Sequence, residues 1–536
     1  MMKKLCTLLF MYVFFLWSPC LFATDEAADF SQKLSAAITF PAGEEHHIGR
    51  IVINDRQNGI TTATWIYVSS ALSVYKKTKP ACIILELDTP GGEVFTAERI
   101  ADALQEMDTQ YNIPVIAYVN NWAMSAGALL AYSCRFIVIA KGASMGAAEP
   151  VTLGATGQME AAPEKITSAL RSDFASRAQF FGRNSAIAMA MVDKDLILVR
   201  RQGKIITLDT EDQVHKDGPQ PDVILKPKGK LLTLNTEQLM EYGVADMMLP
   251  PMRLPPLTEQ EERQEQETGR IPLQKSPFIQ IPFFEHALPC SIDTFREDWQ
   301  TRFLAFLTLP AVSSILFLGL IVGFYMEMTS SGFGIAGLVG LLSLFFIVLS
   351  SFALEAVAWF EPIMLLFGLF LIGLELFFFP TMGILGVLGT LFMVVGLMGM
   401  VLPGIESVQF NGEVLNSAGE YVLHRLGWIC GAIVVAAFII IILSRFMTPK
   451  FRLMHRIILE DTPLLSSGTH AMHAAEIVPE VPIQVGDEAI VSVTCRPSGK
   501  VIYKGIELDV VSTGDFLEKG KRVTIVRIEG LKIFIE

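Results

Sequence analysis

Apolar residues follow two different patterns along the chain. From residue 48 to about residue 249, short apolar runs of strand length alternate with amphipathic runs of helix length. The predicted strands are Ile48–Ile53, Cys82–Leu87, Val115–Val119 and Phe136–Ala140, and the predicted helices are Ile60–Tyr75, Val94–Met107, Ser125–Ser133 and Pro163–Phe181. This alternation predicts parallel strands joined by right-handed crossovers. Because the strands are almost continuously apolar, we expect both faces of the sheet to be covered.

The second pattern begins near residue 303 and is typical of a membrane domain. Five apolar runs, each near the length of a membrane span, cover Phe303–Phe324, Phe333–Leu349, Pro362–Phe379, Met382–Leu402 and Trp428–Leu443. Glycines at positions 319, 334, 337 and 340 recur 49 residues later, which indicates a repeated pair of closely packed helices. The tight turns could instead make re-entrant hairpins, so the prediction is a transmembrane domain over 303–445 with about five spans.

Glu327 and Glu375 occupy equivalent positions in the two repeats. An ionisable residue inside a membrane is by default functional, which suggests a proton path. Both residues also lie near predicted turns, where a carboxylate at the membrane interface needs no function. The sequence leaves both interpretations open.

The ends and connections of the chain have their own composition. Residues 1–23 resemble a secretory signal peptide, with Lys3 and Lys4 before an apolar run and Ala23 at the cleavage point, although an uncleaved anchor is the alternative. Residues 250–302, rich in Pro, Glu and Gln, and residues 446–484 are predicted linkers. Residues 485–536 alternate apolar and polar positions between glycine turns, which predicts a small β-barrel.

Charge indicates the orientation of the chain in a membrane. Basic residues at 445, 450, 452 and 456 follow the last apolar run, which places the C-terminus in the cytoplasm. An odd number of spans then places the N-terminal domain outside, as a signal peptide also requires. We therefore expect a multi-pass protein of the bacterial inner membrane, with a periplasmic or extracytoplasmic N-terminal domain and a cytoplasmic barrel.

Composition excludes several kinds of site. The net charge is −13, and the barrel has few aromatic residues, so neither a basic footprint nor a stacking platform for nucleic acid is present. A role in protein interaction or assembly is therefore favoured for the barrel. The seven cysteines are scattered without a C-x-x-C pair, and no metal or cofactor is predicted.

Candidate chemistry centres on Ser125, which lies between a predicted strand and a predicted helix. The simplest interpretation is a helix N-cap, a position that serine favours. A second turn, at Gly91 and Gly92, follows the neighbouring strand, so both turns are expected at the same edge of a parallel sheet. Backbone amides of Gly91, Gly92 and Ala126 could there form an oxyanion hole for a tetrahedral intermediate.

A nucleophilic serine also needs a base. No histidine occurs between Ser125 and residue 200, so a Ser-His-Asp triad is poorly supported. A lysine whose pKa is lowered by burial can act as the base. Lys165 is the best candidate because apolar residues surround it in sequence, and Lys141 and Lys194 are the alternatives. Any one of these lysines could equally be an ordinary exposed side chain.

Three motifs together resemble a known family. Asp88-Thr-Pro-Gly-Gly, Met124-Ser-Ala-Gly-Ala and Gly146-Ala-Ala-Glu-Pro-Val are similar to the NfeD family of membrane-bound serine proteases of the ClpP class, in the long form with a C-terminal OB-like domain. The resemblance implies an α/β ClpP/crotonase-like spiral over 24–249, an α-helical transmembrane domain and a small all-β OB-like barrel over 485–536. It also implies a catalytic dyad, which maps onto Ser125 and Lys165.

The resemblance implies a function as well. The expected activity is a serine endopeptidase that cleaves hydrophobic segments of membrane-associated proteins, with stomatin- or prohibitin-like partners and self-association into homo-oligomers. The alternative is a non-proteolytic membrane scaffold or assembly factor, and a transporter is a weaker third hypothesis. Two features depart from the family pattern: Glu149 stands where the family loop usually has His, and the β-like stretch from Val199 to Leu225 is longer than usual.

Overall fold

The computed structural model describes residues 20–40, 46–153, 159–217, 219–329, 334–353, 360–378, 383–402, 417–446, 483–514, 516–529 and 532–536. The chain divides into two compact units, Met1–Leu443 and Ser444–Glu536. The predicted signal peptide up to residue 19 and most of the predicted linker 446–484 lie outside the described residues. The signal peptide therefore stays a prediction.

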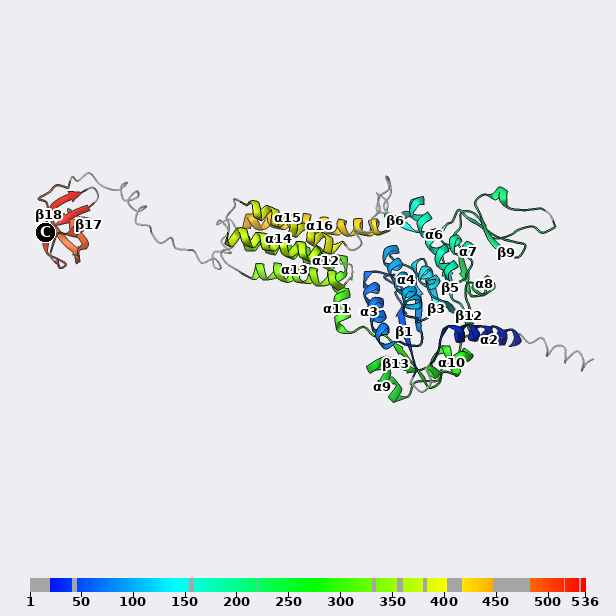
Figure 1. Ribbon diagram of the computed structural model, residues 1–536. Helices are drawn as coiled ribbons and strands as arrows, with labels where there is room; N and C mark the ends of the chain where they lie inside the picture. Colours follow the sequence, from blue (N-terminus) through cyan, green and yellow to red (C-terminus); the bar gives the residue numbers. More distant parts are fainter. Residues whose placement is uncertain are drawn as a thin grey trace, which may run out of the picture. The chain divides into compact units, whose positions relative to one another are not determined.

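A nine-stranded sheet forms the centre of the N-terminal domain (Figure 1). Its strands are β1 (His46–Ile53), β2 (Ile83–Thr89), β3 (Val115–Met124), β4 (Phe136–Ala140), β5 (Ser144–Gly146), β11 (Thr233–Asn235), β12 (Met247–Leu249), β13 (Arg270–Pro272) and β14 (Cys290–Thr294). The central pairs β1–β2, β2–β3 and β3–β4 are parallel, as the sequence predicts. The sheet branches at β3, whose first half pairs with β4 and whose last three residues pair with β5.

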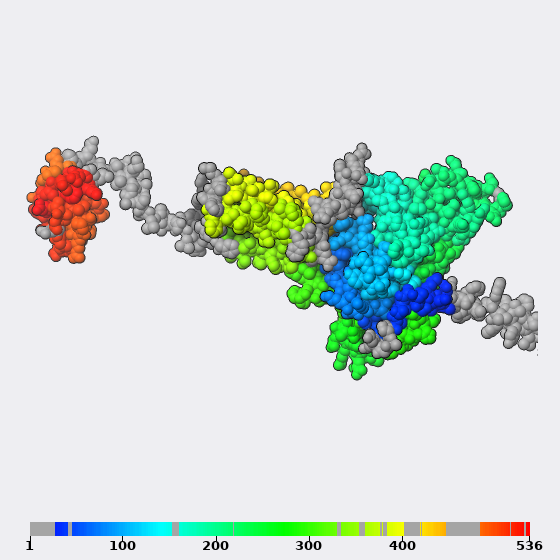
Figure 2. Space-filling view, viewed as in Figure 1, coloured from blue at the N-terminus to red at the C-terminus, as the bar shows by residue number. Residues whose placement is uncertain are grey.

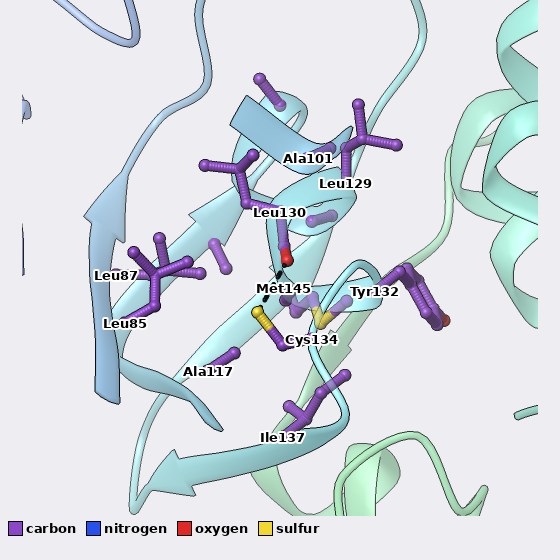
Figure 3. Close-up of a cluster of buried hydrophobic side chains, with 14 of the residues drawn as sticks. Leu85, Leu87, Ala101, Ala117, Leu129, Leu130, Tyr132, Cys134, Ile137 and Met145 are labelled. Atoms are coloured by element: carbon purple, nitrogen blue, oxygen red, sulfur yellow. Dashed lines mark hydrogen bonds between the residues drawn. The ribbon is translucent and has the colours of Figure 1, made fainter. Parts of the chain in front are cut away.

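Helices and a second apolar layer cover both faces of this sheet. The helices after β1, β2 and β3 are α3 (Thr62–Thr78), α4 (Val94–Thr109) and α5 (Ala126–Tyr132), and later ones are α6 (Glu164–Phe180), α7 (Ser185–Val192) and α8 (Thr236–Glu241). Figure 3 shows Leu85 and Leu87 of β2 in the same buried cluster as Leu129 of α5. Ile84, which directly precedes Leu85, belongs to the cluster on the other face. Successive strand residues point to opposite faces, so covering both faces requires the continuous apolar runs seen in the sequence.

Residues 250–302 differ from the linker that their composition predicts. They form α9 (Glu259–Thr268), β13, η2 (Leu273–Lys275), η3 (Pro277–Gln280), α10 (Pro282–Glu285), β14 and the start of α11 (Trp299–Thr308). Strand β14 pairs in parallel with β1, and Phe278 and Phe284 are buried beside Phe30 of helix α2 (Cys20–Ala37). A few well-placed aromatic residues thus complete the domain, although the average composition of the segment is polar.

A smaller antiparallel sheet extends from the outer side of the domain. It contains β8 (Ile197–Arg201), β9 (Lys204–Leu208) and β10 (Val223–Lys226), in the order β10-β8-β9, with the short helix η1 (Glu211–Gln213) between β9 and β10. Figure 1 places β9 at the margin of the domain, away from the central sheet. This sheet contains the β-like stretch from Val199 to Leu225.

Five apolar helices follow in the described residues: α12 (Pro310–Met328), α13 (Ile335–Ala353), α14 (Phe360–Phe377), α15 (Ile384–Val401) and α16 (Ser417–Phe446). Figure 2 shows their side chains packed as one continuous block. By length and composition, three stretches of described residues could cross a membrane: Pro310–Met328, Ile335–Phe352 and Tyr421–Arg445. Ile384–Met400 is a shorter apolar helix, so the expected number of about five spans stays a prediction.

The two repeat glutamates cap helices in the structure. The Glu327 carboxylate accepts hydrogen bonds from the amides of Gly334 and Gly337, both at 2.7 Å. The Glu375 carboxylate accepts one from the amide of Gly383 at 2.8 Å. Each carboxylate at the end of one helix therefore satisfies amides at the start of the next, which need a partner in an apolar environment. Neither sequence interpretation anticipates this capping role.

The C-terminal unit contains a closed five-stranded barrel. Its strands are β15 (Glu488–Val493), β16 (Ser498–Tyr503), β17 (Ile506–Ser512), β18 (Arg522–Glu529) and β19 (Lys532–Ile535). They close in the order β15-β16-β17-β19-β18, and only the β17–β19 pair is parallel among the described strands of this barrel. This is the arrangement of an OB-type barrel, as the sequence predicts.

Candidate active site

Ser125 occupies the turn between β3 and α5 in a strained conformation. Its φ is 51° and its ψ is −117°, a combination that residues other than glycine rarely adopt. It stands at the N-cap position of α5, but its hydroxyl makes no capping hydrogen bond. Ser125 thus takes the cap position that the sequence predicts, but its hydroxyl is left free of the capping role. The backbone is held by a 2.8 Å hydrogen bond from the Ser125 amide to the Gly146 carbonyl.

The glycine turn lies directly against Ser125. Gly91 has a φ of 115°, and a Cβ atom there would lie 2.5 Å from the Ser125 Cβ and 3.0 Å from its Oγ. At Gly92, a Cβ atom would lie 2.1 Å from the Ile60 carbonyl oxygen. Only glycine fits either position without displacing the backbone. The two turns thus meet at the carboxyl edge of β2 and β3, where the sequence places them.

Two of the three backbone amides that the sequence predicts as oxyanion donors make no hydrogen bond to the described residues of the chain. The Gly91 amide donates to the Thr89 hydroxyl at 3.2 Å. Among the residues that the structure describes, the amides of Gly92 and Ala126 donate no hydrogen bond. Gly92 is exposed, whereas Ala126 is only 6% exposed, and a buried amide without a partner is uncommon. Both amides remain able to bind an oxygen atom supplied from outside the chain.

A small apolar pocket of about 10 Å³, with room for about one water molecule, adjoins Ser125. It is formed by helices α4, α5 and α6 and by the loop that precedes β6 (Val151–Leu153), and its lining residues are Val94, Ala97, Ser125, Ala126, Leu129, Ala148, Pro150, Leu170 and Phe174. Apart from the Ser125 hydroxyl, the side chains in this lining carry no polar atom. Such a wall suits an apolar side chain.

The structure does not bring Lys165 into contact with Ser125. Lys165 lies in the first turn of α6, its side chain is exposed, and it makes no hydrogen bond or ion pair with any residue that the structure describes. Leu170 and Phe174, further along the same helix, line the pocket beside Ser125. Residues 154–158, between β6 and β7 (Met159–Ala161), lie outside the described residues. The Ser-Lys dyad stays a prediction.

Lys194 is a weaker alternative base than the sequence suggests. Its Nζ donates to the Glu149 carboxylate at 2.6 Å, and this hydrogen bond and the negative charge raise the pKa of Lys194 above its usual value. A raised pKa holds the amine protonated and therefore unable to accept a proton. Glu149, which stands where the family loop usually has His, thus links the loop beside the pocket to the turn after α7 through its ion pair with Lys194. Lys141, the third candidate, is exposed.

A polar network around Asp88, next to the glycine turn, was not predicted from the sequence. Asp88, which is only 5% exposed, accepts hydrogen bonds from Arg56 Nε at 2.7 Å and from Asn121 Nδ2 at 3.1 Å. A carboxylate that ends a buried strand must have partners, and this signal is visible in the sequence. The identity of Arg56 is not, because the contact depends on which strand lies beside β2.

Three family models match successive parts of the chain. The NfeD1b N-terminal domain matches residues 55–218, the NfeD integral membrane domain matches 311–451, and the NfeD-like C-terminal, partner-binding domain matches 483–536. The chain belongs to the NfeD family. The predicted order is confirmed: an α/β domain, apolar helices and a closed barrel follow one another.

Two relatives are similar to this NfeD chain over different lengths. Membrane protein NfeD1b of Bacillus subtilis (strain 168) is 27% identical over 473 residues, which cover 88% of each chain. The membrane-bound protease PH1510 of Pyrococcus horikoshii is 36% identical over 143 residues, or 26% of this chain. That alignment spans only 32% of the archaeal relative.

Solved structures similar to the N-terminal domain include two kinds of protease. One is a variant of 1510-N, a membrane-bound stomatin-specific protease from Pyrococcus horikoshii, solved with a substrate peptide. Its sequence is 21% identical to this chain and the TM-score is 0.32. The match covers 49% of this chain and 97% of that one. ClpP1 from Listeria monocytogenes is 13% identical, with a TM-score of 0.24, and the match covers 38% and 92%.

Proposed function

We propose that this NfeD protein is a membrane-anchored serine endopeptidase with Ser125 as nucleophile and Lys165 as base. One observation carries the proposal: Ser125 is held in a strained backbone conformation, makes no capping hydrogen bond and packs against Gly91 beside two unoccupied amides. Strain at a buried turn persists only where the surrounding structure enforces it, and it clusters at active sites.

The proposed chemistry is acyl transfer to Ser125. The Ser125 Oγ attacks the carbonyl carbon of a peptide bond while the neutral amine of Lys165 removes its proton. The amides of Gly92 and Ala126 stabilise the resulting oxyanion, and the Gly91 amide joins them if it leaves Thr89. The Lys165 ammonium then protonates the departing amine, and water hydrolyses the ester. Because Lys165 is exposed in this structure, the first turn of α6 must move for the amine to reach Ser125.

The proposed substrates are hydrophobic segments of membrane-associated proteins. The apolar lining beside Ser125 supports this proposal, because an apolar substrate side chain packed against it would leave no polar group unpaired. The match of the barrel to a partner-binding domain and the stomatin specificity of 1510-N support stomatin- or prohibitin-like partners. The proposal includes homo-oligomers, an extracytoplasmic protease domain and no cofactor.

A scaffold without proteolytic activity is the second candidate. The exposed position of Lys165 and the engagement of the Gly91 amide by Thr89 are the observations that favour it. In this case the α/β domain would retain its fold while the barrel and the helices organise a membrane complex. The strained serine argues against it, since a scaffold has no use for strain at that position.

A serine-reactive fluorophosphonate probe distinguishes the two candidates. With the full-length protein in native membranes, we expect labelling of the wild type at Ser125 and none in Ser125→Ala. We expect Lys165→Ala to react about 10²- to 10⁴-fold more slowly, the usual contribution of a general base. Lys141→Ala, which removes another exposed lysine, is the matched control and should react normally.

Two results would contradict the proposal in different ways. A folded wild-type protein that does not react with the probe would favour the scaffold. Full reactivity of Lys165→Ala would exclude Lys165 as the base while leaving Ser125 as the nucleophile.

A further inference from the structure

Strand β2 carries two carboxylates that each bind side chains from two neighbouring segments. Glu86 accepts hydrogen bonds from Arg50 Nε of β1 at 3.0 Å and from Asn120 Nδ2 of β3 at 2.9 Å. Two residues further along, Asp88 is bound in the same manner by Arg56, from the loop after β1, and by Asn121 of β3. The chain thus repeats one arginine–carboxylate–asparagine arrangement, once within the sheet and once at its catalytic edge.

The asparagines belong to an irregularity in β3 just before Ser125. Leu87 pairs with Val119, whereas Thr89 pairs with Ala123, so Asp88 faces three residues of β3. Consecutive side chains of a regular strand point to opposite faces, yet Asn120 and Asn121 both bind carboxylates that lie on one face of β2. Bulges of this kind bend a strand and change the direction of later side chains. The end of this bulge leads directly into the strained turn at Ser125.

Asp88 is also linked, through Arg56, to the loop that supports the turn at Gly91 and Gly92. Its partner Arg56 lies in the loop 55–60, and Ile60 of this loop forms hydrogen bonds to Gly91 and Glu93, at 2.7 and 2.9 Å. Burial raises the pKa of Asp88, but the hydrogen bonds from Arg56 and Asn121 and the Arg56 charge outweigh it, so the pKa lies below its usual value. The carboxylate is therefore charged at neutral pH and holds both donors.

We propose that Asp88 is a positioning residue that sets the distance between the Ser125 hydroxyl and the Gly91–Gly92 amides. This proposal rests on the proposed function of Ser125. One carboxylate anchors the bulge that directs the nucleophile and the loop that supports the glycine turn. Glu86 also binds the bulge, through Asn120, but its arginine partner lies in β1 and not in the loop that supports the glycine turn, so it does not link the two turns.

The test compares Asp88→Asn with Glu86→Gln in the full-length protein. The fluorophosphonate probe gives two quantities, the affinity of its reversible complex and the rate constant of covalent labelling. We expect Asp88→Asn to lower the rate constant about 10²-fold with little change in affinity, the effect of a misplaced reacting group. Glu86→Gln should lower thermal stability and leave the rate constant within about threefold of wild type.

Arg56→Gln serves as a second variant if Asp88→Asn does not fold. The Arg56 side chain is 59% exposed, so its replacement breaks the same ion pair from the solvent side. It should reproduce the loss in rate constant. A loss of equal size in Glu86→Gln, or a normal rate constant in both Asp88→Asn and Arg56→Gln, would overturn the proposal.

Hydrogen exchange tests the same inference without catalytic activity. Peptides covering residues 88–95 and 120–127 should exchange faster in Asp88→Asn and Arg56→Gln. In Glu86→Gln, which disturbs the contact with Asn120, the peptide 88–95 should remain as protected as in wild type. Unchanged exchange in the Asp88 and Arg56 variants would overturn the proposal that Asp88 holds the two turns in place. If the wild type is not labelled at all, the proposed protease function fails, and the exchange measurement alone decides whether Asp88 holds the two turns.

Discussion

At the scale of single residues, backbone geometry distinguishes Ser125 from an ordinary serine. Its positive φ, its unused capping position and the contact with Gly91 are features of three-dimensional position. The residue types were visible in the sequence, because small residues surround Ser125 and two glycines end β2. What the sequence could not show is that the Gly91 turn packs on the serine itself.

Replacing Gly91 by alanine tests this contact. The new Cβ would overlap the Ser125 side chain at 2.5 Å in a backbone conformation with φ near 115°. We expect Gly91→Ala to abolish probe labelling and to lower the free energy of unfolding by about 1–3 kcal/mol. Gly182→Ala is the matched control, because Gly182 also has a positive φ, of 75°, but open space around the new Cβ. Normal labelling of Gly91→Ala would contradict the site geometry.

At the scale of secondary-structure elements, the hydrophobic pattern predicts the central strands and helices closely. The differences occur where tertiary contacts extend an element. Strand β3 runs to Met124 instead of Val119 because its bulged end pairs with β5. Residues 250–302 join the sheet through β14, because a short strand needs only a neighbour with free hydrogen-bonding groups.

The small sheet β8–β9–β10 should open reversibly in acid. The Asp222 carboxylate accepts hydrogen bonds from the Arg201 guanidinium and from the His215 amide, and the bond from Arg201 is the main cause that lowers the pKa of Asp222 to about 2. Because this pKa is lower in the folded state, the stabilisation is complete above the usual value of 3.8. It is lost as the pH falls through about 2.

We therefore expect amides of residues 197–226 to lose protection from hydrogen exchange between about pH 4 and pH 2. Asp222→Asn should exchange faster at neutral pH and show little further change in this range. A wild-type sheet equally protected at both ends of the range would show that Asp222 does not stabilise it.

At the scale of the whole molecule, the chain is an α/β domain, a set of apolar helices and a barrel in the NfeD order. Residue composition along the chain separates these parts because water and lipid impose different constraints. The glutamates of the helical repeat illustrate this, since Glu327 and Glu375 both accept hydrogen bonds from amides at helix starts.

Orientation in the membrane is tested by cysteine labelling in intact cells. Cys430 is exposed, whereas Cys82, Cys134, Cys290 and Cys495 are buried, so a Cys430→Ser background is suitable. Lys204→Cys, exposed in the α/β domain, should react with a membrane-impermeant maleimide in intact cells. Lys519→Cys, exposed in the barrel, should react only after permeabilisation. The reverse result would invert the proposed topology.

The amino-acid sequence by itself determined the domain order, the parallel sheet, the barrel and the two turns that meet at Ser125. These features follow from local hydrophobic periodicity and from glycine, whose backbone freedom is a property of one residue. Only the tertiary structure decided which interactions link distant segments: Glu149 with Lys194, Asp88 with Arg56, and β14 with β1. Such contacts depend on which strands become neighbours, and local pattern does not specify them. The strained backbone of Ser125 belongs to the second group, because the packed segments around it impose that conformation.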